Sequence, residues 1–149
     1  MVQRATQSIV VAAAPSAVYA VVTDFDRYGE WVADLKSIDI LERDGDGRAL
    51  EVAFRAAAFG RSTKYALRYD YSRAPLALSW HQTWGDVTAM LNGSYRFDPA
   101  GAREDATSVT YDLEVALAVP VPQFIQARAA QRIQRHALIE LKSRAEALS

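Results

Sequence analysis

The sequence predicts an α+β fold in which an antiparallel sheet is covered by one long C-terminal helix. Between Leu35 and Val119, apolar and polar residues alternate in short runs separated by turn residues, which is typical of antiparallel strands with one buried face. No helical segment interrupts this region, and this excludes a parallel α/β sheet. From Phe124 to Leu148 the chain contains neither Gly nor Pro and has helical periodicity.

The C-terminal helix is predicted to be the main cover of the sheet. At 1.5 Å per residue it is about 35 Å long, which is enough to cross a small sheet. Pro120 and Pro122 hold the chain extended just before it, and Pro122 is tolerated near a first helical turn. The stripe predicted to face the sheet comprises Ile125, Ala129, Ile133, Ala137, Leu141 and Ala145. The basic side chains project elsewhere and are expected to be solvated: Arg128, Arg132, Arg135 and Lys142.

The first third of the chain reads as a strand, two short helices and a second strand. The β-branched run Thr6–Ala13 predicts the first strand, and Ala17–Val22 predicts a short helix after Pro15. A second short helix is expected near Asp26, and Ser37–Glu42 predicts the next strand. The sequence Asp44-Gly45-Asp46-Gly47 predicts a hairpin turn, because Gly accepts a positive φ at little cost.

Alternation in the remaining strands predicts which side chains point inward. Turns are expected at Phe59-Gly60-Arg61, Ala74-Pro75, Gly85-Asp86 and Pro99-Ala100-Gly101. The predicted apolar face comprises Leu50, Val52, Phe54, Tyr65, Leu67, Tyr69, Tyr71, Leu76, Leu78, Trp80, Gln82, Trp84, Ala89, Leu91, Gly93, Tyr95, Phe97, Val109, Tyr111, Leu113, Val115 and Leu117. His81 falls on the opposite, polar face.

Length and composition predict one globular domain spanning residues 1–149. The chain is 50% hydrophobic and 23% charged, with no low-complexity tract. A formal net charge of -1 gives no general attraction to nucleic acid or to anionic membranes. The chain has no cysteine, which excludes disulfides and thiolate catalysis and fits a cytoplasmic location. No export signal is visible at the start, and we expect no integral membrane association.

The order strand, two short helices, antiparallel meander and long terminal helix resembles the START-like helix-grip superfamily, also called SRPBCC. Five short segments resemble the polyketide cyclase/dehydrase branch of this superfamily more narrowly. These segments are Phe25-Asp26-Arg27-Tyr28-Gly29-Glu30-Trp31, Leu78-Ser79-Trp80, Gly93-Ser94-Tyr95-Arg96-Phe97, Thr107-Ser108-Val109-Thr110-Tyr111 and Val119-Pro120-Val121-Pro122. The resemblance covers almost the whole chain. It implies a curved sheet of about seven strands that grips the terminal helix around an apolar tunnel.

The residues themselves indicate the same hollow, because small side chains on the helix stand opposite aromatic rings on the sheet. A well-packed core is the alternative interpretation of this large-against-small pattern. The predicted ligand-binding residues are Trp31, Val52, Phe54, Tyr65, Leu67, Tyr69, Trp80, Gln82, Trp84, Leu91, Tyr95, Tyr111, Leu113, Ala129, Ile133, His136 and Ala137. The resemblance implies that the cluster of Phe25, Tyr28 and Trp31 lies near the mouth of the tunnel, where Phe25 is expected to pack against the sheet edge and Trp31 to contact ligand.

Three side chains are candidates for catalysis, namely Gln82, Tyr95 and His136. An imidazole facing the cavity would be a usable acid or base near neutral pH, and a buried amide would need a partner such as a ligand carbonyl. A bulge that turns Gln82 outward is the alternative for that residue. The two histidines lack matching carboxylates, so we expect no metal site and no cofactor.

The predicted function is binding of a hydrophobic small molecule, lipid-like or polyketide-like, by a carrier or transport protein. One alternative is an aromatic polyketide cyclase/dehydratase, in which positioning of a flexible chain supplies much of the rate. Another is a protein-interaction module without a ligand, in which the basic helix face binds a partner chain or nucleic acid. We expect a monomer or homodimer and no nucleic-acid partner.

Overall fold

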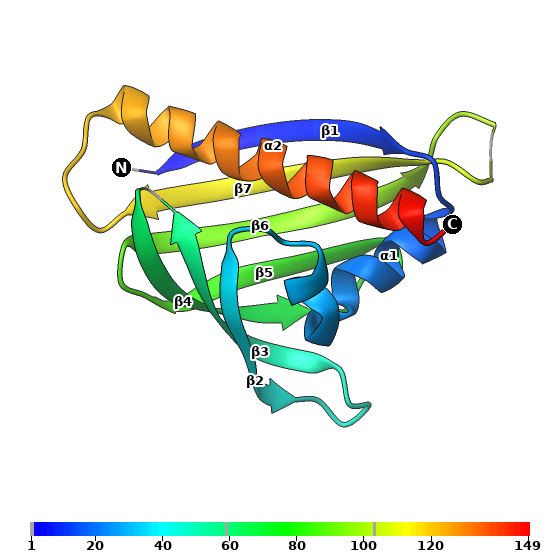
Figure 1. Cartoon of the computed structure of the whole chain (residues 1–149), viewed down its shortest axis with the longest axis horizontal. Helices are drawn as coiled ribbons and strands as arrows, with labels where there is room; N and C mark the ends of the chain where they lie inside the picture. The colour runs from blue at the N-terminus through cyan, green and yellow to red at the C-terminus, as the bar shows by residue number, and fades with distance from the viewer. Residues whose placement is uncertain (1, 59, 103) are drawn as a thin grey trace.

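A computed structural model shows the arrangement of residues 2–58, 60–102 and 104–149. It contains an antiparallel sheet, two α-helices and a short 3₁₀ helix, which confirms the predicted α+β class and the helix-grip arrangement (Figure 1). In chain order the elements are β1 (Gln3–Val11), α1 (Pro15–Thr23), the 3₁₀ helix η1 (Phe25–Glu30), β2 (Leu35–Arg43), β3 (Ala49–Ala58), β4 (Arg61–Asp70), β5 (Ala77–Gly85), β6 (Thr88–Pro99), β7 (Thr107–Leu117) and α2 (Gln123–Ala147).

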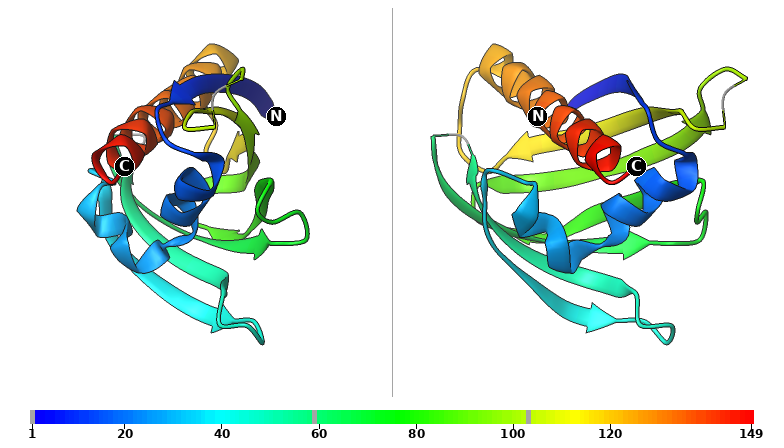
Figure 2. Two further views of the ribbon diagram at one scale, coloured as in Figure 1. Left: turned by 90° about the vertical axis from the view of Figure 1, so that its right-hand side faces the viewer. Right: turned by 45° about the vertical axis from the view of Figure 1, so that its right-hand side comes forward.

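The sheet has seven strands in the order β1-β7-β6-β5-β4-β3-β2. Strands β2 to β7 follow one another as a meander, and β1 joins at the far edge by pairing with β7. The sheet curves around the side on which α2, α1 and η1 lie (Figure 2). All these pairs are antiparallel, so short turns suffice to connect the meander.

Three glycines with positive φ occupy turns between strands, at Gly47, Gly60 and Gly101. A positive φ is accessible to Gly because it has no Cβ, and this explains why these turns form at these positions. Gly47 lies in the predicted hairpin between β2 and β3. Phe59, which was predicted to share the turn with Gly60, lies outside the described residues.

Bulges in β5 and β6 correct the predicted orientation of two residues. The ladder between β4 and β5 shifts register where Leu67 pairs with Gln82 but Ala66 pairs with Trp84. One extra residue in β5 therefore turns Trp84 to the outer face, where it is 55% exposed. A similar shift in β6 leaves Ala89 exposed and not on the apolar face.

Leu76 was also predicted to lie on the apolar face, and this expectation is wrong. Leu76 precedes β5 in the turn that follows β4 and is 67% exposed. Alternation fixes the direction of a side chain only within a paired strand, so it does not extend into this turn.

The two short helices close one end of the curved sheet. Pro15 begins α1, where a missing N–H costs no hydrogen bond, and Val18 and Val22 are buried on its inner side. Phe25 of η1 packs its ring 4.7 Å from that of Tyr69 on β4, measured between centroids. These contacts hold η1 against the inner face of the sheet.

Helix α2 packs chiefly against β1, and also against β7 and α1. It begins at Gln123 directly after Pro122, whose ψ of 146° is extended. Its buried residues are Gln126, Ala130, Gln134, Leu138, Leu141 and Ala145. The predicted stripe is therefore correct for Leu141 and Ala145 but rotated for the first half of the helix. Ile125 of that stripe is 43% exposed.

Hydrogen bonds explain why glutamines replace apolar residues on this face. The fully buried Gln134 donates from Nε2 to the carbonyl oxygens of Ala5 (2.8 Å) and Tyr111 (2.9 Å). These two bonds satisfy the Nε2 end of the amide and fix α2 on β1 and β7, while Oε1 of Gln134 is buried without a partner among the described residues. In the described residues, no helix is long and apolar enough to cross a membrane.

Candidate functional site

The inner face of the sheet brings together aromatic side chains that are far apart in the sequence. The predicted site residues that lie on the inner side of the sheet or pack against its core are Trp31, Val52, Phe54, Tyr65, Leu67, Tyr69, Trp80, Gln82, Leu91, Tyr95, Tyr111, Leu113, Ile133 and Ala137. We call this set of residues the interior. Which of these residues contact a ligand remains a prediction.

The aromatic rings of the interior form a connected wall. The indole of Trp80 lies 5.3 Å from the ring of Tyr95 and 5.7 Å from that of Tyr111, measured between centroids. Tyr69 lies 6.0 Å from Trp80 on the other side. Phe54 stacks on Tyr65 at 5.2 Å. Rings in such tilted and stacked contacts support one another, so the wall keeps its shape without a ligand.

The ring of Trp80 occupies space that Gly93 leaves open. These residues are paired across β5 and β6. A Cβ at Gly93 would lie 2.6 Å from Cζ2 of Trp80 and 2.7 Å from the carbonyl oxygen of Asp112. The indole can therefore lie flat against β6 only because position 93 has no side chain.

Four tyrosine hydroxyls of the interior have no hydrogen-bond partner among the residues that the structure describes, and they belong to Tyr65, Tyr69, Tyr95 and Tyr111. Sealed polar side-chain atoms without a partner occur in the described residues only on glutamines and one arginine. The tyrosine oxygens are not among these sealed atoms, so each keeps some access to water. Water or a polar atom of a ligand can bond them.

Burial keeps these phenols neutral. Desolvation raises the pKa of Tyr65 to about 12. The pKa values of Tyr69, Tyr95 and Tyr111 are raised as well, first by desolvation and then by the neighbouring tyrosines. Near neutral pH all four side chains therefore act as hydrogen-bond donors and acceptors, and none is a base.

Tyr28 of η1 also packs against the interior, although sequence reasoning assigned it no place among the site residues. Its ring lies 5.0 Å from that of Trp31, and its hydroxyl donates to the carbonyl oxygen of Val22. Trp31 is half-buried and so stands between the interior and solvent. The concentration of aromatics in a short polar segment was the signal that could have identified Tyr28.

Side chains of α2 fasten the segment between η1 and β2 beside Trp31. Oε2 of Glu140 accepts the backbone N–H of Ala33 at 2.8 Å, and Arg144 donates to Oε1 of Glu30 at 2.7 Å. Glu140 and Arg144 are four residues apart and therefore project from the same side of the helix. This segment is thus held to α2 by charged groups and not by an apolar core.

His136, the third member of this side of α2, does not sit as predicted. Its Nδ1 atom lies 3.8 Å from Oδ2 of Asp34, and its side chain is 47% exposed. It lies at the edge of the site with access to solvent, because the helix is rotated relative to the predicted stripe. Ala129 is half-buried and is not part of the core cluster.

Gln82 keeps its predicted inner position, but its amide is engaged. Nε2 donates to the carbonyl oxygen of Thr88 at 2.8 Å, and the hydroxyl of Thr88 donates to Oε1. Both ends of the amide therefore bond β6, which fixes the orientation of the side chain. Trp84, two residues further, is excluded from the interior by the bulge described above.

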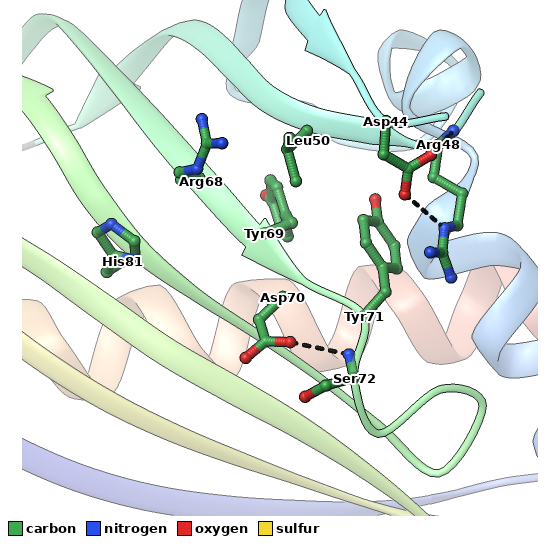
Figure 3. Close-up of a pocket in the computed structure, with 9 residues that line it drawn as sticks. All are labelled: Asp44, Arg48, Leu50, Arg68, Tyr69, Asp70, Tyr71, Ser72 and His81. Atoms are coloured by element: carbon green, nitrogen blue, oxygen red, sulfur yellow. Dashed lines mark hydrogen bonds and ion pairs between the residues drawn. The ribbon is translucent and has the colours of Figure 1, made fainter. Parts of the chain in front are cut away.

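A depression of about 380 Å³ lies beside the hairpin that joins β2 and β3, and Tyr69 of the interior is one of the residues that line it (Figure 3). Four of its lining residues are charged, namely Asp44, Arg48, Arg68 and Asp70, and each of them has a polar partner. Nε of Arg48 lies 2.8 Å from Oδ2 of Asp44, and Arg68 bridges Glu42 and Glu51. No group of three or more metal-ligating side chains occurs in the described part of the chain.

Comparisons with known proteins agree with this geometry. The family described as "Polyketide cyclase / dehydrase and lipid transport" matches residues 2–146. Among curated protein sequences, none matches this chain. A START superfamily protein from Mycobacterium smegmatis is 25% identical, with a TM-score of 0.91, and the match covers 98% of this chain and 99% of that one.

Two aromatase/cyclase structures share the fold at lower identity. The Zhui aromatase/cyclase from Streptomyces sp. R1128 is 14% identical, with a TM-score of 0.84 over 98% of this chain and 94% of that one. The di-domain ARO/CYC BexL is 20% identical, with a TM-score of 0.75, and the match covers 95% of this chain and 45% of that one. On the match along almost its whole length, this chain belongs to the polyketide cyclase/dehydrase and lipid transport family of the START-like superfamily.

Proposed function

We propose that this protein binds a hydrophobic small molecule, lipid-like or polyketide-like, between the curved sheet and α2, and that it serves as a carrier. One observation supports this most strongly. Four tyrosine hydroxyls, which have no hydrogen-bond partner among the described residues, belong to a wall that is otherwise made of rings and aliphatic groups. Such a wall binds apolar surface, while a few polar groups fix the orientation of the ligand.

The ligand expected from this wall is largely apolar and carries a few carbonyl or hydroxyl oxygens. Ring faces of Trp80 and Phe54 suit flat or flexible hydrocarbon, and the neutral phenols of Tyr95 and Tyr111 suit oxygen acceptors. The family description, which names both polyketide cyclases and lipid transport, supports these two classes. A strongly anionic ligand is not expected, because the buried polar residues in the described part of the chain are threonines and glutamines and include no basic side chain.

Catalysis by a polyketide cyclase/dehydratase is the second candidate, and the aromatase/cyclase relatives favour it. Of the three candidate groups, only Tyr95 offers an unengaged polar atom to the interior. Gln82 bonds Thr88, and His136 lies at the exposed edge. With the pKa of Tyr95 raised by burial, its phenol orients a substrate better than it transfers protons near neutral pH.

Ligand binding is tested first with purified protein and a hydrophobic fluorophore, using Trp84→Phe so that tryptophan emission reports only on Trp31 and Trp80. Saturable quenching of this emission, together with a co-purified apolar molecule released in denaturing mass spectrometry, is the expected result. Absence of both would overturn the proposal.

Paired tyrosine variants locate the site. Tyr95→Phe removes one oxygen and leaves the ring, so affinity for an oxygen-bearing ligand is expected to fall by roughly threefold to tenfold. Tyr71→Phe is the matched control, because its hydroxyl bonds the carbonyl oxygen of Ala49 at 2.6 Å. Equal affinities in the two variants would place the ligand elsewhere.

Incubation of excess protein with a flexible poly-β-ketone separates carrier from enzyme. Recovery of the bound compound in its original form supports a carrier. Formation of a cyclised or dehydrated product at a rate that Tyr95→Phe lowers would show that the protein is an enzyme and would replace the carrier proposal.

A further inference from the structure

The outward face of α2 carries an unusual combination of exposed apolar and basic side chains. Phe124 is 64% exposed, Ile139 is 53% exposed, and Ile125 is 43% exposed. At 100° per residue, the arginines that project between these apolar groups are Arg128, Arg132 and Arg135. We call these six residues the outer α2 face. All six are exposed in the described structure, and in Figure 1 α2 lies on the outside of the molecule, in front of β1 and β7.

The three arginines are not used by the fold. None of them forms an ion pair or a side-chain hydrogen bond among the residues that the structure describes. Other arginines do so, since Arg48 pairs with Asp44 and Arg144 pairs with Glu30. The first carboxylate of α2 is Glu140, which accepts the N–H of Ala33 instead of neutralising this face.

The apolar side chains of the outer α2 face are also largely exposed to solvent. Phe124 and Ile139 are separated by 15 residues, which is about four helical turns, and lie on the same side of the helix as the arginines. Three large apolar side chains that remain in contact with water on a regular helix forgo part of the free energy that their burial would release. A partner that buries them while neutralising the arginines would recover this free energy.

We propose that the outer α2 face docks on the surface of an anionic lipid bilayer. Helices with arginines interspersed among Phe and Ile lie in the interface, where apolar side chains enter the acyl boundary and long basic side chains reach the phosphates. The helix lies on the bilayer and does not cross it, in keeping with the absence of a spanning helix among the described residues. This property is separate from the proposed ligand binding and requires no ligand in the interior.

Other occupants fit this face less well. A second copy of the chain, related by a two-fold axis, would place the three arginines against their own equivalents. Nucleic acid would neutralise the arginines, but its phosphates would leave Phe124 and Ile139 without an apolar partner. The overall net charge of -1 also provides no general attraction to a polyanion, so binding depends on this local face.

The test is co-sedimentation of the full chain with vesicles of phosphatidylcholine alone or with added phosphatidylglycerol. We expect binding to the anionic vesicles, weak binding to the neutral ones, and weaker binding as salt is raised. Arg128→Glu with Arg132→Glu is expected to lower the partition coefficient by more than about tenfold. Phe124→Ser with Ile139→Ser is expected to lower it by about tenfold.

Matched controls lie in the turn between β4 and β5. Arg73→Glu with Leu76→Ser changes one exposed arginine and one 67% exposed leucine away from α2, and it should leave the partition coefficient within about twofold of the original. Circular dichroism verifies that every variant is folded. Vesicle binding that survives the double charge reversal, or binding to nucleic acid in place of vesicles, would overturn the proposal.

Discussion

Gly93 faces Trp80 across the ladder between β5 and β6, and its missing side chain determines where the indole lies. The Trp80 ring in turn contacts Tyr69, Tyr95 and Tyr111. One residue without a Cβ therefore positions much of the aromatic wall. At the scale of single residues, the interior depends on such close approaches as much as on the hydrophobicity of its members.

Gly93→Ala is expected to destabilise the protein by about 1–3 kcal/mol, because the new Cβ would lie 2.6 Å from Cζ2 of Trp80 with β6 unable to retreat. Urea unfolding followed by circular dichroism measures the loss, and a shift of tryptophan emission reports the displaced indole. Gly29→Ala is the control, since nothing lies within 4 Å of a Cβ built there. Equal stability of the two variants would contradict this account of the Trp80 contact.

Alternation along the strands predicted most of the inner residues but failed for Trp84. An inserted residue reverses the facing of every side chain after it, and apolar periodicity contains no signal for such an insertion. Gly85 was the available hint, because Gly within a strand often marks a bulge. A Cβ at Gly85 would lie 2.6 Å from the carbonyl oxygen of Thr88.

At the scale of elements, α2 was predicted with nearly correct ends and with a buried face that is rotated in the first half of the helix. Hydropathy places Gln126 and Gln134 on the surface, whereas both are buried. Gln134 bonds the carbonyl groups of Ala5 and Tyr111, and these bonds exist only after the helix has docked, so no sequence pattern shows them. The rotation moves Ile125 outward and leaves Ile133 and Ala137 at the flank that packs against the core.

Gln134→Ala is expected to lower the free energy of unfolding by about 2–4 kcal/mol. The variant loses two hydrogen bonds to β1 and β7 and creates a cavity beneath α2. Thermal and urea unfolding measure the change. Gln131→Ala, at an exposed position three residues earlier, should change stability by less than about 0.5 kcal/mol. A Gln134→Ala protein as stable as the Gln131→Ala protein would show that the amide does not anchor the helix.

At the scale of the whole molecule, the curved sheet and terminal helix follow from patterns that local sequence contains. The space between the sheet and the helix does not follow from such patterns, because it depends on how tightly the rings pack against one another and against α2. The tyrosines report on this packing: all seven in the chain have a raised pKa, with desolvation as the largest cause in each case. Folding therefore favours the protonated phenol throughout the protein.

The sign of the resulting pH dependence follows from linkage. A group whose pKa is higher in the folded than in the unfolded chain contributes its full stability below the unfolded value, which is about 10 for tyrosine. That contribution is lost as pH rises toward the folded value, which is about 12 for Tyr65 and for Tyr71. Each such group removes up to about 1.4 kcal/mol per pH unit in this window.

We therefore expect the folded protein to resist ionisation of its tyrosines and then to unfold cooperatively above about pH 10. The ultraviolet absorbance of tyrosinate and the circular dichroism of the helices should change together in one transition. The same chain in urea should instead titrate gradually near the ordinary tyrosine pKa. Stepwise ionisation of several tyrosines while the helical signal persists would mean that water enters the interior freely. In that case the raised pKa values, and the enclosed ligand site inferred from the same residues, would both be wrong.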